Sequence, residues 1–267
     1  MHTGACVQAT QIQIALSGVI PALVAMWLVD RLDAKRPEPP RLRRLVAGVG
    51  MLSVIPAILI GLILQKYTSS SIGSALTYEG ASFNSFLVAA GVEEACKIMV
   101  VYWVVWRHPE FDERMDGIVY ACRAGLGFAL VENVMYLLSE ATLGGQLTVW
   151  LLRALLAVPG HALWTGMIGY CAARRRFDRT GLGLLGGYLL AVSFHGLYDL
   201  SLFVQQPMHL EGREELARPL LAAPVALTVL AFLVVRAMAR NALHLDDAQA
   251  ARAAAEAART PIQPRLY

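Results

Sequence analysis

Charged residues are scarce in this chain of 267 residues, of which they make up only 16%. Soluble domains contain about 25% charged residues, whereas 57% of this chain is hydrophobic and its mean hydropathy is +0.51. The apolar stretches repeat along the whole chain and leave no room for a separate soluble domain. The composition therefore favours a membrane protein, and a net charge of +3 is too small to indicate a nucleic-acid partner.

Cysteine patterns and basic leader sequences are also lacking. The chain has four cysteines, Cys6, Cys96, Cys122 and Cys171, and no CxxC pair, so neither a disulfide framework nor a zinc site built from cysteines is indicated. No HExxH motif occurs. No Lys or Arg precedes the first apolar run, so we expect residues 11–29 to be a retained span and not a cleaved secretory signal.

Long hydrophobic runs are what the chain does contain. A window of about 20 residues matches a helix that crosses a bilayer core of about 30 Å. The sequence predicts an all-α, polytopic membrane bundle of about seven transmembrane helices. The predicted spans are 11–29, 45–64, 83–106, 117–139, 147–173, 181–204 and 219–239.

The distribution of Lys and Arg predicts the orientation of these spans. Seventeen of these residues lie in the connections 30–44, 107–116 and 174–180 and in the segment from Arg236 onward, whereas the alternate connections carry three. Since cytoplasmic connections are enriched in Lys and Arg, we expect the N-terminus outside and the C-terminus in the cytoplasm. Residues 1–240 would form one membrane domain, and 241–267 a solvated cytoplasmic tail.

Ionisable residues occur in the apolar cores of the third to sixth spans only. An Asp, Lys or Arg at the centre of a membrane helix costs about 2.5–3.5 kcal/mol, so such groups are expected to face a polar cavity and to be functional. With a rise of 1.5 Å per residue, they converge on one layer in the outer half of the bilayer. The candidates are Glu93, Glu94, Lys97, Glu132, His161, His195 and Asp199.

Spacing within the helices predicts how some of these residues pair. Lys97 follows Glu93 by four positions and Glu94 by three, so either acid can pair with it on one face. The two adjacent acids diverge by about 100° around the axis and are therefore expected to have different roles. His195 and Asp199 are also four apart, so the carboxylate can hold one imidazole nitrogen and leave the other free, as is common for histidines that bind metals.

Two histidines and several carboxylates in a polar pocket suit zinc, which binds imidazole nitrogen and carboxylate oxygen and leaves one position for water. The residues therefore suggest hydrolysis of a peptide bond within the membrane. They also allow a proton- or ion-coupled transporter, in which acid and histidine relays occur, or a non-catalytic membrane scaffold. The polar groups stop in the outer half of the bilayer, which disfavours a transport path.

Four motifs in order resemble those of the PrsW family of intramembrane proteases, which is related to the CAAX prenyl-protease and bacteriocin-processing group. They are Glu93-Glu94-x-x-Lys97, Phe128-x-x-x-Glu132-Asn133, Pro159-Gly160-His161 and His195-x-x-x-Asp199, and they span the core 83–204. The resemblance implies an integral protein of the bacterial cytoplasmic membrane. It would cleave single-span membrane substrates, such as anti-sigma factors, on their extracytoplasmic side, using metal-bound or glutamate-activated water.

The resemblance also implies roles for individual residues. Glu93 is expected to be the general base, although Glu94 could exchange roles with it, and Lys97 would pair with an acid or stabilise an oxyanion. Asp199 would orient His195, and Asn133 would contact substrate or join two helices. Arg123 and Arg153 are expected to cap helices or pair with acids. The predicted zinc ligands are Glu132, His161 and His195; a metal-free glutamate mechanism is the alternative.

Overall fold

The computed structural model describes residues 2–71 and 76–259, and within them every regular element is a helix. Short breaks divide several long helical runs into separately numbered elements. In chain order they are α1 (His2–Ser17), α2 (Val19–Leu32), α3 (Pro40–Leu52), α4 (Val54–Ser71), α5 (Tyr78–Phe83), η1 (Asn84–Gly91), α6 (Val92–Val104), α7 (Arg114–Ser139), α8 (Leu143–Leu152), η2 (Arg153–Ala157), α9 (Val158–Asp178), α10 (Gly183–Phe203), α11 (Gln205–Leu210), α12 (Glu214–Leu220) and α13 (Ala223–Arg259).

Local sequence signals explain where several of these helices begin. Thr77 and Thr142 each accept a hydrogen bond from the backbone N–H three residues on, which caps α5 and α8. Glu113 and Asp116 form a reciprocal capping box at the start of α7. The segments η1 and η2 are π-helical, and each leads directly into a helix that carries predicted site residues. Such π-helical turns are frequent at functional sites.

Six of the predicted spans correspond to helices long and apolar enough to cross a membrane. The seventh, predicted at 83–106, is also helical, since α5, η1 and α6 form one continuous run, but its charged residues set it apart from the other six. The six are Gln8–Leu32, Pro40–Tyr67, Arg114–Ser139, Leu143–Asp178, Gly183–Leu210 and Glu214–Arg259. The all-helical membrane bundle is thus confirmed, and the number of spans is six or seven.

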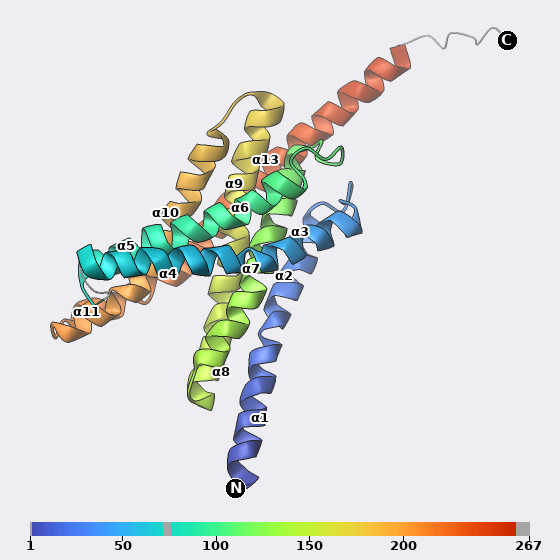
Figure 1. Cartoon of the computed structure of the whole chain (residues 1–267). Coiled ribbons are helices and arrows are strands. Elements are labelled where there is room, and N and C mark those ends of the chain that lie inside the picture. Colours follow the sequence, from blue (N-terminus) through green and yellow to red (C-terminus); the bar gives the residue numbers. More distant parts are fainter. Residues whose placement is uncertain (1, 72–75, 260–267) are drawn as a thin grey trace.

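Helix α7 lies at the centre of the bundle and packs against α9, α3 and α2 (Figure 1). Its contact with α9 is close because glycines face each other: a Cβ on Gly169 would lie 1.9 Å from the carbonyl oxygen of Gly117. Such small residues allow membrane helices to approach. The runs α3–α4 and α5–α6 lie side by side and cross α7 and α9.

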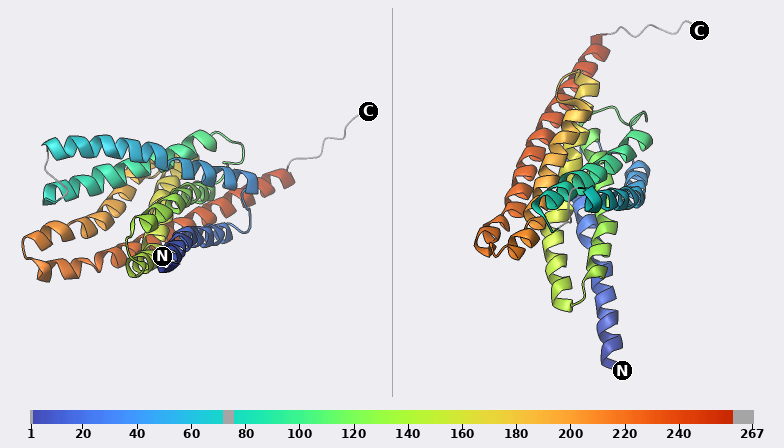
Figure 2. Two further views of the ribbon diagram at one scale, coloured as in Figure 1. Left: turned by 60° about the horizontal axis from the view of Figure 1, so that its bottom comes forward. Right: turned by 60° about the vertical axis from the view of Figure 1, so that its left-hand side comes forward.

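The Lys- and Arg-rich connections gather on one side of the bundle. In Figure 1 the α9–α10 connection lies at the top and the α2–α3 and α6–α7 connections and the C-terminal end of α13 lie toward the upper right, whereas the N-terminal end of α1, the α7–α8 connection and α11 lie at the bottom and lower left. The right-hand view of Figure 2 shows the same separation between the N-terminal end of α1 and the C-terminal end of α13. This arrangement agrees with the alternation predicted from the basic residues.

The predicted boundary at residue 240 is not a structural break, because α13 continues through it to Arg259. The start of the predicted tail is also not fully solvated. Asp246 is buried and accepts hydrogen bonds from the backbone and guanidinium of Arg114 at the start of α7. Every described residue from Gln249 onward is exposed, so the expectation of a solvated tail is wrong only for its first turns.

Candidate active site

The predicted site residues come from four helices that meet beside the centre of the bundle. Glu93, Glu94 and Lys97 lie on α6, Glu132 and Asn133 on α7, His161 on α9, and His195 and Asp199 on α10. All except Asn133 are joined by contacts of 4.0 Å or less into one cluster. The predicted convergence of the third to sixth spans is therefore present in the structure.

Lys97 occupies the middle of this cluster and is fully buried. Its Nζ donates hydrogen bonds to Glu93 Oε2 at 3.0 Å and Glu94 Oε1 at 2.9 Å, and lies 2.8 Å from His161 Nδ1. The same ammonium group lies 4.3 Å from the centre of the Phe128 ring. A buried ammonium needs such partners to offset its desolvation, and here it holds both acids and one histidine in fixed positions.

Glu94 is fully buried behind this lysine and holds His195. Its Oε1 lies 3.1 Å from His195 Nδ1, and its Oε2 accepts a hydrogen bond from the Thr165 hydroxyl at 2.8 Å. When Nδ1 donates to Glu94, His195 Nε2 is left to Asp199, whose Oδ2 lies 3.3 Å away as the i, i+4 spacing predicts. Glu94 thus provides a second carboxylate–histidine contact beside the one predicted with Asp199.

Glu132 and His161 form the opposite half of the cluster. Glu132 Oε2 lies 2.7 Å from His161 Nε2 and accepts a hydrogen bond from Arg153 Nη2 at 2.7 Å. His161 is therefore held at both ring nitrogens, by Glu132 on one side and by Lys97 on the other. The expectation that Arg153 pairs with an acid is confirmed, and so is the same expectation for Arg123, which bonds to Asp30.

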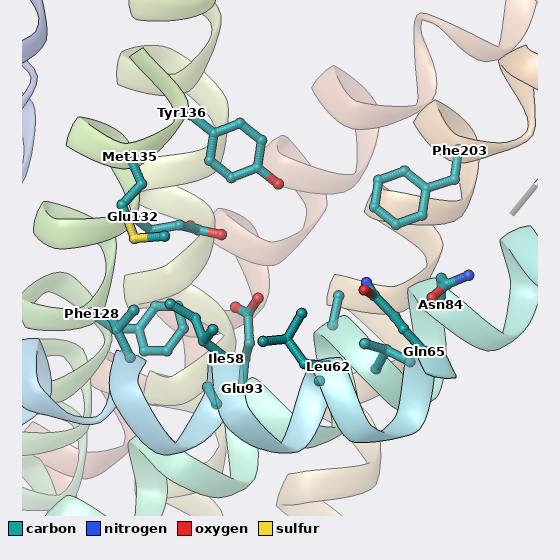
Figure 3. A pocket seen from close by; sticks show the side chains of 15 residues that line it. Ile58, Leu62, Gln65, Asn84, Glu93, Phe128, Glu132, Met135, Tyr136 and Phe203 are labelled. Carbon is teal, nitrogen blue, oxygen red and sulfur yellow. The ribbon is translucent and has the colours of Figure 1, made fainter. Parts of the chain in front are cut away.

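Glu93 and Asp199 lie on the Nε2 side of His195. The Nε2 atom of His195 is 3.3 Å from Asp199 Oδ2 and 4.0 Å from Glu93 Oε2. Glu93 and Glu132 line a cavity of about 270 Å³, whereas Glu94 does not reach it. Figure 3 shows the carboxylates of Glu93 and Glu132 pointing into the same space from α6 and α7. The two adjacent acids thus occupy different environments, as their angular separation predicts.

Aromatic rings pack around the histidines and keep them from turning. The Trp164 ring stacks on His195 with centroids 4.1 Å apart, and it meets His161 edge-on at 5.4 Å. The His161 and His195 rings are themselves 5.4 Å apart and nearly perpendicular. Since these rings cannot rotate freely, the nitrogen that each histidine presents is fixed by packing as well as by hydrogen bonds.

Asn133 is the one predicted site residue that lies outside this cluster. Its amide donates to the carbonyl oxygen of Gly18 at 3.0 Å and accepts a hydrogen bond from Arg153 Nε at 2.6 Å. It therefore joins the N-terminal helices to α7 and fixes Arg153, which in turn holds Glu132. Of the two roles the sequence left open for Asn133, the geometry matches the contact between helices.

Three neighbours hold residues of the cluster in place, and the sequence did not predict these particular contacts. They are Arg153, which bonds Glu132, Thr165, which bonds Glu94, and Trp164, which stacks on His195. Arg153 could have been found from its charge within an apolar span. Thr165 lies one turn after His161 and on the same helical face, but a threonine in a membrane helix gives no signal without the partner that it bonds.

The donor set suits a metal ion. Glu93, His161 and His195 each offer one ligand atom, and these atoms lie within 4.8 Å of one another. Two imidazoles and a carboxylate are a common protein ligand set for catalytic zinc, which keeps one position open. Glu132, which the sequence assigned as a ligand in place of Glu93, lies against His161 and Arg153. The side chains therefore suit a metal ion, and the carboxylate ligand would come from Glu93 or from Glu132.

Comparison with known proteins agrees with these observations. Residues 38–239 match the model of a family described as PrsW family intramembrane metalloprotease. The chain belongs to the PrsW family. A protein named Protease PrsW from Geobacillus kaustophilus is 32% identical over 192 residues, which is 71% of this chain and 80% of that protein. One of the same name from Bacillus subtilis is 32% identical over 70% of this chain and 81% of its own length.

Another protein named Protease PrsW, from Clostridioides difficile, is 29% identical over 73% of this chain and 81% of its own length. No solved structure matches the chain. Membership of the PrsW family makes this chain an integral membrane protease, and thus a hydrolase. The transporter and scaffold that the sequence also allowed are thereby set aside.

Proposed function

We propose that this protein cleaves a single-span membrane protein, of the anti-sigma-factor kind, near the extracytoplasmic face of the bacterial cytoplasmic membrane. The observation that carries this proposal is the buried cluster of Glu93, Lys97, His161 and His195 beside a cavity within the helical bundle. It unites a base, a cation and two imidazoles, groups that can support peptide hydrolysis, within the helical bundle.

In the proposed reaction, Glu93 accepts a proton from water as the water oxygen bonds to the carbonyl carbon of the substrate. The same proton then passes to the amide nitrogen as the C–N bond breaks, which leaves a new carboxyl and a new amine. Glu93 suits this role because it lines the cavity, while Glu94 is committed to His195 and Thr165. A positioned base of this kind contributes about 10²–10⁴-fold.

Zinc is the proposed cofactor, held by His161, His195 and Glu132, which leaves Glu93 free to act as the base. When bound, such an ion supplies Lewis-acid polarisation of the carbonyl and makes water more acidic. The protein's own contribution is to fix the donors: Glu94 sets the orientation of His195, and Lys97 that of Glu93 and His161. Arg153 and Asn133 determine where the Glu132 carboxylate lies.

The shape of the cavity supports access from the lipid. Ile58 and Leu62 line it and are 39% and 58% exposed on the outer surface of the bundle, where the acyl chains would be. Met135 and Tyr136 on α7 complete this rim (Figure 3). A substrate helix could therefore approach between α4 and α7 without crossing a polar surface, and its unwound backbone could enter the cavity.

The cavity extends toward the predicted extracytoplasmic ends of three helical runs. Gln65 lies near the end of α4, Asn84 near the start of the α5–α6 run, and Phe203 at the end of α10. All three line the cavity with Glu93, and they lie together in Figure 3. Cleavage in the outer part of a substrate span follows from this position together with the predicted orientation.

The test is cleavage of a single-span reporter by purified enzyme in proteoliposomes, with the product termini identified by mass spectrometry. We expect cleavage in the outer part of the span, loss of cleavage in His195→Ala, and about one zinc per chain that falls in His161→Ala. Glu79→Gln, an exposed acid outside the cluster, serves as the matched control and should cleave normally. Normal cleavage by His195→Ala would contradict the proposed site, and active enzyme without metal would favour the glutamate mechanism.

A further inference from the structure

A second group of acids lies where the α2–α3 connection meets the start of α7, about 24 Å along this helix from Glu132. Asp33 follows α2, Glu38 lies in the connection, and Asp116 is in the first turn of α7. Their relative exposures are 2%, 6% and 1%. One carboxylate oxygen from each lies within 4.8 Å of the others. Three carboxylates are thus buried together on the side predicted to face the cytoplasm.

The acids Glu38 and Asp116 hydrogen-bond each other, and their other partners are neutral. Glu38 accepts a hydrogen bond from the Tyr120 hydroxyl. Asp116 Oδ2 accepts hydrogen bonds from the backbone N–H groups of Asp112 at 2.8 Å and Glu113 at 2.7 Å. Neither contact supplies a positive charge, so the cost of burying the carboxylates is not offset by these groups.

Asp33 supplies the observation that points to a ligand. Both of its carboxylate oxygens are buried, and neither has a hydrogen-bond partner in the described part of the chain. Buried polar atoms without partners are rare, and they indicate an ion, a water or a special role. Since one Asp33 oxygen is within ligand distance of Glu38 and Asp116, the unpartnered carboxylate points into the acidic cluster.

The neighbouring arginines form their ion pairs with other acids. Arg36 donates to Glu113 at 2.6 Å and to Asp247 at 2.8 Å, while its Nη2 is buried without a hydrogen-bond partner. Arg114 is paired with Asp178 and Asp246. Within residues 2–71 and 76–259, no Lys, Arg or His forms an ion pair of 4.0 Å or less with any of the three acids. The cluster therefore needs positive charge that the described side chains do not provide at contact distance.

We propose that Asp33, Glu38 and Asp116 bind a hard divalent cation, Ca²⁺ or Mg²⁺, separate from the active-site metal. The donors are all oxygen atoms, which these ions prefer. Two oxygens that bind the same Ca²⁺ or Mg²⁺ ion are at most about 4–5 Å apart, and the three carboxylate oxygens lie within 4.8 Å of one another. The ion ties the α2–α3 connection to the start of α7, the central helix of the bundle.

The test uses the full-length protein in detergent, stripped with a chelator and then given Ca²⁺, Mg²⁺ or Mn²⁺. At a cation concentration about 100-fold above the dissociation constant, we expect the melting temperature to rise by about 5–10 °C. Asp33→Asn and Glu38→Gln should lose this rise, and Glu110→Gln, an exposed acid nearby, should keep it. The ion giving the larger shift at equal concentration identifies the preferred ligand.

Bound Mn²⁺, counted by electron paramagnetic resonance, separates this site from the active site. We expect His195→Ala to keep the Mn²⁺ that Asp33→Asn loses, and Asp33→Asn to keep the zinc bound by the active-site cluster. Equal Mn²⁺ binding by wild type and Asp33→Asn would overturn the proposal. So would a melting temperature that does not respond to any cation, because the acids would then be neutralised by shared protons.

Discussion

The chain buries two groups of carboxylates, and they differ in what balances their charge. In the active site, Lys97 lies between Glu93 and Glu94 and Arg153 bonds Glu132, so each of these three glutamates has a cation at 2.7–3.0 Å. In the cluster of Asp33, Glu38 and Asp116, no such pair occurs among the described residues. The active-site acids are balanced by Lys97 and Arg153, whereas the second group needs a bound cation.

This difference suits the tasks proposed for the two groups. The active site must keep its acids in place while a substrate and a proton move, so fixed cations inside the fold are an advantage. An acidic group at the end of a helix and in a connection needs only to join two segments, which a bound ion can do. The buried site is also rigid, because aromatic rings pack on both histidines.

The largest expected effect separates the two acids of the active site. Glu93→Gln should lower the cleavage rate by about 10²–10⁴-fold through loss of the base with little change in melting temperature, because Glu93 lines a cavity. Glu94→Gln should lower both the cleavage rate and the melting temperature, since Glu94 is fully buried and holds His195. Reporter cleavage and thermal denaturation measure the two quantities. Equal behaviour of the two variants would contradict their different roles.

Removal of the internal cation should be the most destabilising change. Lys97→Met leaves Glu94 charged and buried, which costs about 3–5 kcal/mol when one partner of a buried pair is lost. Adding Glu94→Gln should recover part of this loss, because the uncompensated charge is then gone. Denaturant unfolding in detergent gives the free energies for the cycle. Additive losses would show that the pair does not act as a unit.

A smaller effect is expected where a residue acts through another. Arg153→Gln should reduce activity and metal affinity by about 10–100-fold, as is typical for groups that orient ligands, because it releases Glu132 and Asn133. Arg153→Lys should restore part of the activity by keeping the charge. Zinc titration is the second readout; unchanged zinc affinity in an inactive Arg153→Gln would argue against a positioning role.

The pH dependence of the acidic cluster should depend on the cation. Burial, and then the nearby Asp116 and Glu113 carboxylates, raise the pKa of Asp33 from 3.8 to about 7, partly opposed by Arg36 and reinforced by Asp246. Without cations, an acid with a raised pKa contributes stability that is fully present below its unfolded pKa. This stability is lost as the pH rises from about 4 through the folded pKa of about 7.

Melting temperatures measured in chelator from pH 4.5 to 8 should therefore fall less in Asp33→Asn than in wild type, and at pH 8 the variant should be the more stable protein. With saturating Ca²⁺ the order should reverse. If wild type and Asp33→Asn kept the same order of melting temperatures with and without Ca²⁺, the proposed cation site would be contradicted.

The smallest effect is expected on the surface next to this cluster. Asp247 accepts hydrogen bonds from Lys35 at 3.1 Å and Arg36 at 2.8 Å, but its side chain is 44% exposed. Exposed ion pairs contribute little to stability. Asp247→Asn should leave the melting temperature and its rise with cation unchanged. If Asp247→Asn lost as much of this rise as Asp33→Asn, the exposed ion pair and not the buried acids would account for the cation response.

The sequence by itself determined the helical membrane architecture and most members of the active site. Apolar runs of span length can only be helices in lipid, and the cost of intramembrane charge marks the functional side chains. The motifs placed Glu93, His161 and His195 together correctly. Helical spacing also predicted that Glu93 and Glu94 would differ.

Only the tertiary structure decided which neighbour each side chain meets. In the structure, Glu94 and not Asp199 contacts the Nδ1 atom of His195, and Asn133 bonds Arg153. Asp33 and Glu38 lie beside Asp116, although more than seventy residues separate them in the sequence. The physical reason is that a helical position fixes a face of one helix, whereas partners depend on how several helices pack. That packing rests on local features, such as the close approach of Gly117 and Gly169, which no charge pattern reveals.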